Sequence, residues 1–325
     1  GLVKILVIRF SAIGDVLLTF PILQGLKNKY PEAEIHVLTK KEQAQLFDLL
    51  PFHVHQWVFS GNLIATARSI RRHKFDRVID LHNNLRTLLL QVLSAKSHWQ
   101  RVRKYNVLKW RITTFKKKNL IVPHIVTRYA KAAEVEEYLT PLALQLPKEN
   151  VPDLPENYIA WVVGAKFKTK QFPLEKIRET IAACDFPVVI LRGKEEMPLG
   201  ETLELEFAHV INIAGKTTIQ EAAGILAWAK AVVTNDTGLM HLASFFNKRM
   251  LVLWGNTVPE FGMGPYGVTK VSHFQVPDLS CRPCSKIGYN TCPKGHFNCM
   301  QGQDTALLAH RINALFHQET QESPE

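Results

Sequence analysis

Long apolar runs are absent from this sequence of 325 residues, and none approaches the roughly 20 residues that a membrane-spanning helix needs. The opening stretch GLVKILVIRF is about one strand long, contains Lys4 and Arg9 and lacks a cleavage signature, so we do not expect a signal peptide. Without an export signal we expect a cytoplasmic protein whose five cysteines are reduced. Apolar residues make up 46% of the chain, which excludes a disordered protein and suffices for two domains.

Acidic residues are absent from one long segment, Leu81–Ala133, which contains twelve lysines and arginines. Because the whole chain has a net charge of +11, the remainder is close to neutral. A basic field on one side of a protein predicts an anionic partner, such as a lipid phosphate, a membrane surface or nucleic acid. No recognition motif for nucleic acid accompanies the segment, so we expect no nucleic-acid partner and favour an anionic lipid surface. The cations assigned to this surface are Arg101, Arg103, Lys104, Lys109 and Arg111.

The part of this segment that reads KYNVLKWRITTFKKK, Lys104–Lys118, has helical spacing and interleaves cations with aromatic residues. Its apolar face consists of Tyr105, Leu108, Ile112 and Phe115. Trp110 lies off that face among cations, which is typical of a helix anchored at a membrane interface. The alternative is a helix docked on the core with a solvated basic face.

A glycine-rich dinucleotide fingerprint is also missing from both halves of the chain. GMGPYG (Gly262–Gly267) formally matches G-x-G-x-x-G, but it contains Pro265 and no helical pattern follows it, so we interpret it as a shaped loop. This absence disfavours an NAD-dependent oxidoreductase, which remains the alternative among Rossmann-type enzymes.

Short apolar runs alternate with helical patterns from one end of the chain to the other, which predicts βαβ units and parallel sheets covered on both faces. The alternation is interrupted at Pro147–Asn157, where three prolines indicate a linker. We therefore predict two doubly wound α/β domains, residues 1–150 and 151–325, facing each other across a cleft. The expected strands are Val3–Ile8, Glu34–Thr39, Val54–Phe59, Asp76–Leu81, Tyr158–Gly164, Pro187–Gly193, His209–Gly215, Ala231–Asn235 and Arg249–Gly255. The expected helices of the first half are Gly14–Tyr30, Glu42–Leu50 and Leu63–His73.

Ligands of open parallel sheets bind beyond the carboxyl ends of the strands, so we expect the functional residues in the loops that follow the strands. In AVVTNDTGLMHLASFF a buried strand ends near Asn235, and Asp236 or Thr237 is a suitable N-cap for the helix that follows. The N–H groups at the start of that helix, from Thr237, Gly238 and Leu239, would bind an anion, and His241 in its first turn would add a hydrogen bond. The alternative is a capped helix with a core histidine.

Three other loops carry charged candidates. In VIRFSAIGDVLLTFP, Asp15 lies at a helix start, where it is either a general base that works by position or a plain N-cap. In GAKFKTKQFP, lysines 166, 168 and 170 follow a strand and suit a diphosphate, unless they are simply solvated. In RGKEEM, Glu195 or Glu196 is a weaker candidate for binding ribose hydroxyls or adenine.

These loops, in this order, resemble glycosyltransferase family 9, the lipopolysaccharide heptosyltransferases. The resemblance lies in KILVIRFSAIGDVLLTFPIL, in GAKFKTKQFP and in VVTNDTGLMHLASFFNKRMLVLWGNTVPEFGMGPYG, and it spans nearly the whole chain. The cysteine-containing stretch CRPCSKIGYNTCPKGHFNCM also resembles a segment found in many members. It implies the GT-B fold of two facing Rossmann-like domains. It also implies an inverting transfer of heptose from ADP-heptose to a lipopolysaccharide core acceptor, without a metal ion or other cofactor.

The resemblance also implies a role for individual residues. Asp15 resembles the proposed catalytic base, and Lys170 in KQFP matches the lysine near the donor phosphates. The residues that match the donor-diphosphate site are Thr237, Gly238, Leu239 and His241, with Asp236 as a nearby polar residue and Glu195 or Glu196 as a looser match for ribose or adenine. The N-terminal half would bind the anionic, lipid-linked saccharide at the inner face of the cytoplasmic membrane, in agreement with the basic segment.

Cysteines are few but clustered. Four of the five, with one histidine, form the pattern C-x2-C-x7-C-x3-H-x2-C. Its members are Cys281, Cys284, Cys292, His296 and Cys299. Such spacing in a cytosolic protein raises a structural zinc site as one option, against a loop with buried thiols or an adventitious disulfide. A non-enzymatic zinc or nucleic-acid module would explain the cysteines and the charge, but it would leave Asp15 without a role. The fifth, Cys184, is expected in the core.

Overall fold

The computed structural model describes residues 2–94, 98–117, 119–142, 144, 146 and 151–318. The chain divides into a first unit, Gly1–Asn106 with Val122–Gln145, and a second unit, Val107–Ile121 with Leu146–Glu325. The division at residue 150 therefore needs one correction, because residues 107–121 belong to the second unit and not to the N-terminal domain. Part of the expected linker, residues 147–150, lies outside the described residues.

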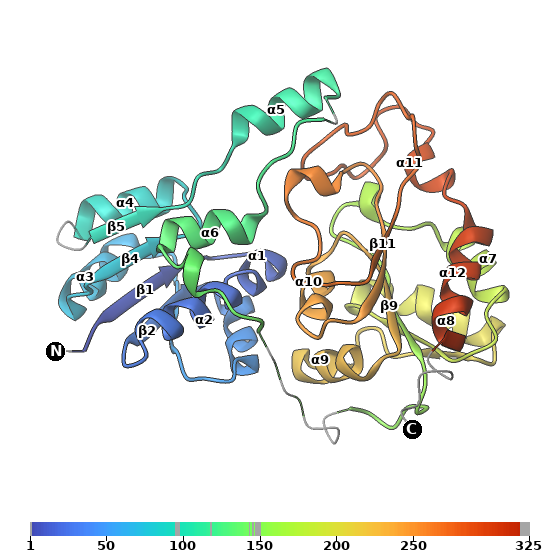
Figure 1. Ribbon diagram of the computed structural model, residues 1–325, viewed down its shortest axis with the longest axis horizontal. Helices are drawn as coiled ribbons and strands as arrows, with labels where there is room; N and C mark the ends of the chain where they lie inside the picture. Colours follow the sequence, from blue (N-terminus) through green and yellow to red (C-terminus); the bar gives the residue numbers. More distant parts are fainter. Residues whose placement is uncertain are drawn as a thin grey trace. The chain divides into compact units, whose positions relative to one another are not determined.

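A parallel sheet with the strand order β3-β2-β1-β4-β5 forms the centre of the first unit (Figure 1). Its strands are β1 (Lys4–Ile8), β2 (Glu34–Thr39), β3 (His55–Val58), β4 (Arg77–Asp80) and β5 (His98–Arg101). The first four lie within the strands that the sequence predicts. The edge strand β5 is not predicted, because HWQR contains no apolar run.

The helices of the first unit depart from the sequence pattern at two places. They are α1 (Ile13–Leu17), α2 (Phe20–Lys29), α3 (Leu63–His73), α4 (Leu85–Ser94) and α6 (Ile125–Ala133). The single helix expected over Gly14–Tyr30 is broken into α1 and α2, and the break falls next to Pro21, which suits the first turn of a new helix. The α-helix expected over Glu42–Leu50 is instead a 3-10 helix, η1 (Lys41–Leu49), in which the buried Leu46 and Leu49 are three residues apart and so share one face.

The second unit is built around a parallel sheet with the strand order β11-β10-β9-β6-β7-β8. Its strands are β6 (Ile159–Val162), β7 (Val188–Leu191), β8 (Val210–Asn212), β9 (Ala231–Asn235), β10 (Arg249–Leu253) and β11 (Val271–Phe274). Its helices are α5 (Asn106–Phe115), α7 (Leu174–Ala182), α8 (Met197–Glu206), α9 (Ile219–Trp228), α10 (Gly238–Ser244), α11 (Asn298–Gln301) and α12 (Thr305–Gln318). The five strands that the sequence predicts are confirmed, and β11 is an additional edge strand.

Both units are doubly wound, because the strand order reverses beside the first strand of each sheet. The two reversal points lie between β1 and β4 and between β6 and β9, and in such sheets ligands bind beyond the carboxyl ends of the strands at this point. The predicted class of two Rossmann-like α/β domains with parallel sheets is thereby confirmed.

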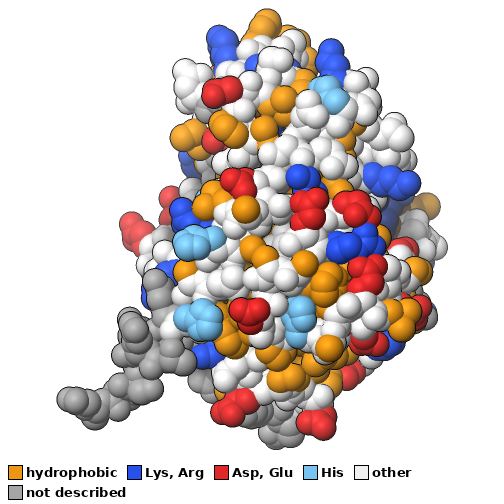
Figure 2. Space-filling view, turned by 90° about the vertical axis from the view of Figure 1, so that its right-hand side faces the viewer, with side chains coloured by type: hydrophobic (Ala, Val, Ile, Leu, Met, Phe, Trp, Pro, Cys, Tyr) orange, Lys and Arg blue, Asp and Glu red, His pale blue; other side chains and the backbone are white. Residues whose placement is uncertain are grey.

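Large apolar side chains fill the core of each unit. In the second unit the buried Trp161 of β6 stacks on Phe172, with ring centroids 6.4 Å apart. Cys184 is buried as expected. The side of the second unit seen in Figure 2 carries acidic and basic side chains next to one another, in agreement with a near-neutral remainder of the chain. Among the described residues, no helix combines the length and the apolar character needed to cross a bilayer.

Candidate active site

Asp15 lies in the first turn of α1. This helix follows β1, at the reversal point of the first sheet. Its Oδ2 atom is 3.1 Å from Nη2 of Arg9 and accepts a hydrogen bond of 3.4 Å from the backbone N–H of Ala12. The N-cap of this helix is Ala12, so Asp15 is not the N-cap that the alternative interpretation expected, although its carboxylate bonds the N–H of the N-cap residue from the third helical position. Among the described residues Oδ1 receives no hydrogen bond, and the side chain is 27% exposed, so one oxygen is available to a substrate hydroxyl.

Arg9 fixes the orientation of Asp15. It donates from Nε to the carbonyl oxygen of Ser11 at 2.8 Å and from Nη1 to that of Leu81 at 3.1 Å. The guanidinium thereby ties the loop after β1 to the loop after β4 while it holds the carboxylate. The sequence gives no special signal for Arg9, because it is simply the residue after a strand.

His82 is the other titratable group close to this corner. Its Nδ1 atom accepts a hydrogen bond of 3.3 Å from the N–H of Phe10. Burial, together with the nearby cations Arg9 and Lys104, lowers the pKa of His82 to about 4. Because Nδ1 accepts this hydrogen bond, the neutral ring carries its proton on Nε2 and has no free lone pair. Asp15, with Oδ1 unpaired among the described residues, is therefore the better candidate base.

Two residues of α6 complete the corner and were not singled out by the sequence pattern. Arg128 is only 5% exposed, and its Nη1 donates to the carbonyl oxygens of Arg103 and Lys104. Within the described part of the chain, Nε and Nη2 of Arg128 and the hydroxyl of Tyr129 have no hydrogen-bond partner. Burial raises the pKa of the Tyr129 phenol and lowers the pKa of Arg128. Unpaired donors of a buried cation are suited to an anionic group of a ligand.

The five cations assigned to one anionic surface have different surroundings. Arg101 is an internal brace, because its Nη1 lies 3.0 Å from the fully buried carboxylate of Asp80 and its Nη2 donates to Gln91. Arg103 is exposed and its guanidinium lies over the ring of Tyr105. The remaining three are Lys104 in the first unit and Lys109 and Arg111 on α5 in the second unit. The apolar face expected on α5 is only partly buried, since Ile112 is buried while Phe115 is exposed. Trp110, which the sequence places off that face, is exposed as well.

The donor loops of the second unit meet at the reversal point between β6 and β9. Nζ of Lys170 lies 2.9 Å from Oδ2 of Asp236, and the same oxygen accepts a hydrogen bond of 3.0 Å from Oγ1 of Thr257. Lys166 and Lys168 are exposed, so the structure selects Lys170 among the three lysines of this loop. Asp236 therefore pairs with a cation and does not cap α10.

No side chain caps the start of α10. Thr237 occupies the N-cap position, but its Oγ1 instead accepts a hydrogen bond from Nη1 of Arg192. Gly238 and Leu239 begin the helix beside the Lys170–Asp236 pair, whereas His241 is buried in its first turn. An uncapped helix start next to a lysine can bind a phosphate group.

Of the two candidate glutamates, the structure favours Glu196. Glu195 is exposed, whereas the Glu196 side chain is 12% exposed and packs against Gly164, the second residue after β6. Gly164 has φ +77°, and a Cβ atom there would lie 2.2 Å from the Glu196 carboxylate, so only glycine leaves room for it. Burial raises the pKa of Glu196, and its Oε2 has no hydrogen-bond partner among the described residues.

A family model, described as glycosyltransferase family 9 (heptosyltransferase), matches residues 63–293. The chain belongs to glycosyltransferase family 9. It is 25% identical over 299 residues to the lipooligosaccharide heptosyltransferase 2 of Haemophilus influenzae, covering 79% of this chain and 85% of that protein. The solved structure of the Escherichia coli ADP-heptose LPS heptosyltransferase II is similar with a TM-score of 0.74 at 22% identity, covering 98% and 99% of the two chains. The E. coli heptosyltransferase WaaC with ADP-2-deoxy-2-fluoro heptose gives a TM-score of 0.66 at 19% identity, covering 96% and 99%.

Membership of family 9 makes the chain a glycosyltransferase, as the sequence predicts, and the oxidoreductase alternative is not favoured. The likeness to the two E. coli structures shows that the fold is the GT-B fold implied by the resemblance. Within this family 9 chain, Asp15 of the first unit and the Lys170–Asp236 pair of the second lie at corresponding positions, each at the reversal point of a Rossmann-like sheet.

One group of residues resembles a metal site but has the wrong hydrogen bonds for it. Ligand atoms of Glu34, His36 and His55 in this family 9 chain lie within 4.8 Å of one another. However, Nδ1 of His36 accepts a hydrogen bond from Nε1 of Trp57, and Nε2 lies 2.6 Å from Glu34. The neutral ring therefore carries its proton on Nε2, where a metal ion would need a lone pair.

Proposed function

We propose that this protein transfers heptose from ADP-heptose, with inversion, to a saccharide of the lipopolysaccharide core. The observation that carries the proposal is the Lys170–Asp236 pair beside the uncapped start of α10, at the reversal point of a Rossmann-like sheet. This corner suits the diphosphate of a nucleotide sugar. The printed names of the relatives, which specify heptosyltransferases and ADP-heptose, support the identity of the donor.

Each donor-side residue has a distinct role in this proposal. Lys170 and the N–H groups at the start of α10 stabilise the charge that grows on the departing diphosphate. Glu196, a largely buried carboxylate with an oxygen that is unpaired among the described residues, accepts hydrogen bonds from the ribose hydroxyls. Arg192 holds Thr237 and so keeps the helix start open to the phosphates.

The acceptor side supplies the base. Oδ1 of Asp15 takes the proton of the acceptor hydroxyl as its oxygen forms a bond to the anomeric carbon. The bond from that carbon to the phosphate oxygen breaks on the opposite side, ADP leaves with the electron pair, and the configuration inverts. The unpaired Nε and Nη2 of Arg128 bind an acidic group of the acceptor.

A donor screen tests the proposed activity. With ADP-heptose and a lipopolysaccharide core acceptor we expect ADP release, and we expect ADP to raise the Tm by about 5 °C at 100 times its Kd. NAD should leave the Tm unchanged, because no glycine-rich fingerprint is present. Turnover of a different NDP-sugar with no response to ADP would contradict the choice of donor.

We further propose that the protein is cytoplasmic and associates with the inner face of the membrane through the first unit. Helix α4 carries an exposed aliphatic face at i, i+3, i+4 and i+7 spacing, formed by Leu85, Leu88, Leu89 and Val92. Its opposite face is buried through Thr87, Leu90 and Ser94. Because the surrounding segment, Leu81–Ala133, has no acidic residue, an anionic bilayer complements both its charge and its exposed leucines.

The double variant Leu85→Ser/Val92→Ser is expected to lower vesicle affinity about tenfold, because two exposed aliphatic side chains would no longer enter the bilayer. Sedimentation with phosphatidylcholine vesicles, with and without phosphatidylglycerol, measures this. Leu205→Ser on α8 is the matched control, since Leu205 is 89% exposed but lies in the second unit. Wild-type binding that ignores phosphatidylglycerol, or unchanged binding of the double variant, would argue against this surface.

A further inference from the structure

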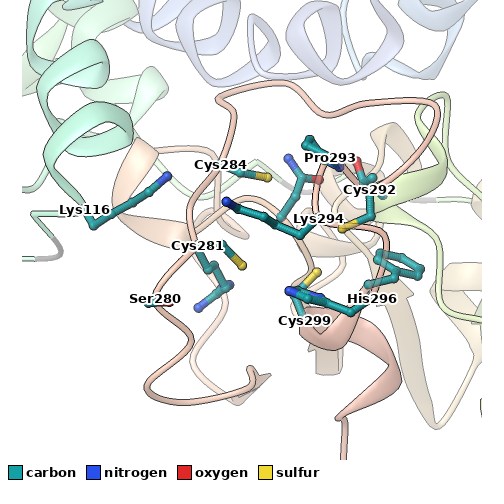
Figure 3. A pocket seen from close by; sticks show the side chains of 13 residues that line it. Lys116, Ser280, Cys281, Cys284, Cys292, Pro293, Lys294, His296 and Cys299 are labelled. Atoms are coloured by element: carbon teal, nitrogen blue, oxygen red, sulfur yellow. The ribbon is translucent and has the colours of Figure 1, made fainter.

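Four cysteines of the second unit line a single cavity of about 320 Å³. They come from the loop after β11 and from α11, and their side chains are directed into the same space (Figure 3). The residues concerned are Cys281, Cys284, Cys292 and Cys299. All of them are free thiols. The clustering that the spacing suggested is therefore present in space.

Arg282, which lines the same cavity, is a buried cation without an anionic partner. It is 4% exposed and donates to three neutral oxygens: the carbonyls of Gly255 at 2.7 Å and Thr257 at 2.9 Å, and Oε1 of Gln275 at 2.6 Å. Within the described ranges, no carboxylate lies within ion-pair distance of it. Since burying an unpaired charge is costly, its position calls for an anionic group in the cavity.

Asn256 provides an independent sign that something occupies the cavity. It lines the wall, is 2% exposed, and neither Oδ1 nor Nδ2 of its amide has a hydrogen-bond partner in the part of the chain that the structure describes. Buried side-chain amides nearly always form hydrogen bonds. The unpaired amide of Asn256 therefore indicates that a bound group, or polar atoms around such a group, occupy the cavity.

We infer that the cavity holds one transition-metal ion, zinc or iron, bound by the thiolates of Cys281, Cys284, Cys292 and Cys299. Both metals accept four thiolates in tetrahedral geometry. Four thiolates and a divalent ion have a net charge of −2, which supplies the anion that Arg282 lacks. Lys116 and Lys294 also line the cavity and balance the remaining charge.

The sulfur atoms of the four cysteines are further apart in this structure than they would be around a bound ion. Sulfur atoms at about 2.3 Å from a tetrahedral metal are roughly 3.8 Å from each other. Among the described residues the cysteines do not form a group of three within 4.8 Å. A change of one cysteine rotamer moves its sulfur by roughly 3 Å, which is enough to close the set inside a cavity of this size. His296 is exposed and its Nδ1 accepts from the N–H of Asn298, so it is not part of the set.

The centre would position Lys170, a consequence that rests on the proposed function. Tyr289, between the second and third cysteines, accepts from the backbone N–H of Thr169 at 3.1 Å and donates its own N–H to Thr169 Oγ1 at 2.8 Å. Thr169 directly precedes Lys170 and itself lines the cavity. Loss of the ion would therefore loosen the loop that brings Lys170 to Asp236.

Elemental analysis of the purified full chain tests the metal site without reference to activity. We expect about one zinc or iron ion per chain in the wild type and in Cys184→Ala, whose thiol is buried away from the cavity. Cys281→Ser/Cys284→Ser should retain less than about a tenth of that amount, because two ligands are lost. A mercurial titration of the wild type should release the metal as the thiols react.

Separate measurements of folding and of disulfide formation serve as controls. A metal-free but folded wild type, a mass two daltons low from a disulfide among these cysteines, or full metal content in the double variant would each overturn the site. If the double variant does not fold, the mercurial titration of the wild type decides the question. A fall of about tenfold in ADP affinity on metal removal supports the positioning of Lys170, and unchanged ADP affinity refutes that part alone.

Discussion

Asp15→Asn is expected to lower kcat by about 10²- to 10⁴-fold, because an amide cannot take the proton of the acceptor hydroxyl. Asparagine has nearly the same shape and can still accept from the N–H of Ala12 and from Arg9, so the helix start is preserved. The KM for the donor should change little, since the donor loops lie in the second unit. Initial rates of ADP release at saturating acceptor measure the effect.

The matched control is Asp48→Asn, which removes an exposed carboxylate from the same unit at a site without catalytic neighbours. It should keep the wild-type rate. Circular dichroism and the Tm of both variants show that the fold is intact. A folded Asp15→Asn enzyme within threefold of wild type would remove Asp15 from the mechanism and leave the proposed base without support.

The sequence reveals the two sheets because their central strands are short, mostly apolar runs that local pattern can detect. The loops after β1, β6 and β9 follow directly from those runs, so Asp15, Lys170 and Asp236 are found at once. The edge strands β5 and β11 are missed because their side chains are half exposed and polar residues interrupt them. A residue in the loop after a strand can thus be located from the sequence wherever the strand itself is buried.

Pairings between distant residues are not readable in this way. Arg101 looks like one more surface cation until β5 places it 3.0 Å from the buried Asp80. Arg128 looks equally ordinary, and only the packing of α6 shows that its guanidinium is buried with unpaired donors. Charge counting located the basic segment, but burial decides which of its cations face a ligand and which brace the fold.

The choice between two adjacent candidate site residues also requires the three-dimensional structure. Glu195 and Glu196 are equivalent in the pattern, and the packing of the second against Gly164 distinguishes them. Likewise, the assignment of residues 107–121 to the second unit depends on contacts far along the chain, such as the hydrogen bond of 2.6 Å from Lys116 Nζ to the carbonyl of Pro283. No local periodicity records such a contact.

Lys170→Ala should lower kcat by about 10²- to 10³-fold, the usual loss when one group that stabilises developing charge is removed. It should also weaken ADP binding, because Asp236 would then present an unpaired carboxylate, 12% exposed, to the diphosphate. Steady-state rates and calorimetric titration with ADP measure the two effects. Lys168→Ala is the matched control, since Lys168 is exposed two residues earlier in the same loop.

A second substitution separates the direct contribution of the lysine from repulsion by its partner. In the Lys170→Ala background, Asp236→Asn should recover part of the ADP affinity, because it removes the repelling charge. It should not recover kcat, since the cation that stabilises the leaving group is still missing. Equal losses in Lys170→Ala and Lys168→Ala would mean that the loop acts only through its overall charge, and the specific pair of Lys170 with Asp236 would then have no part in binding the donor.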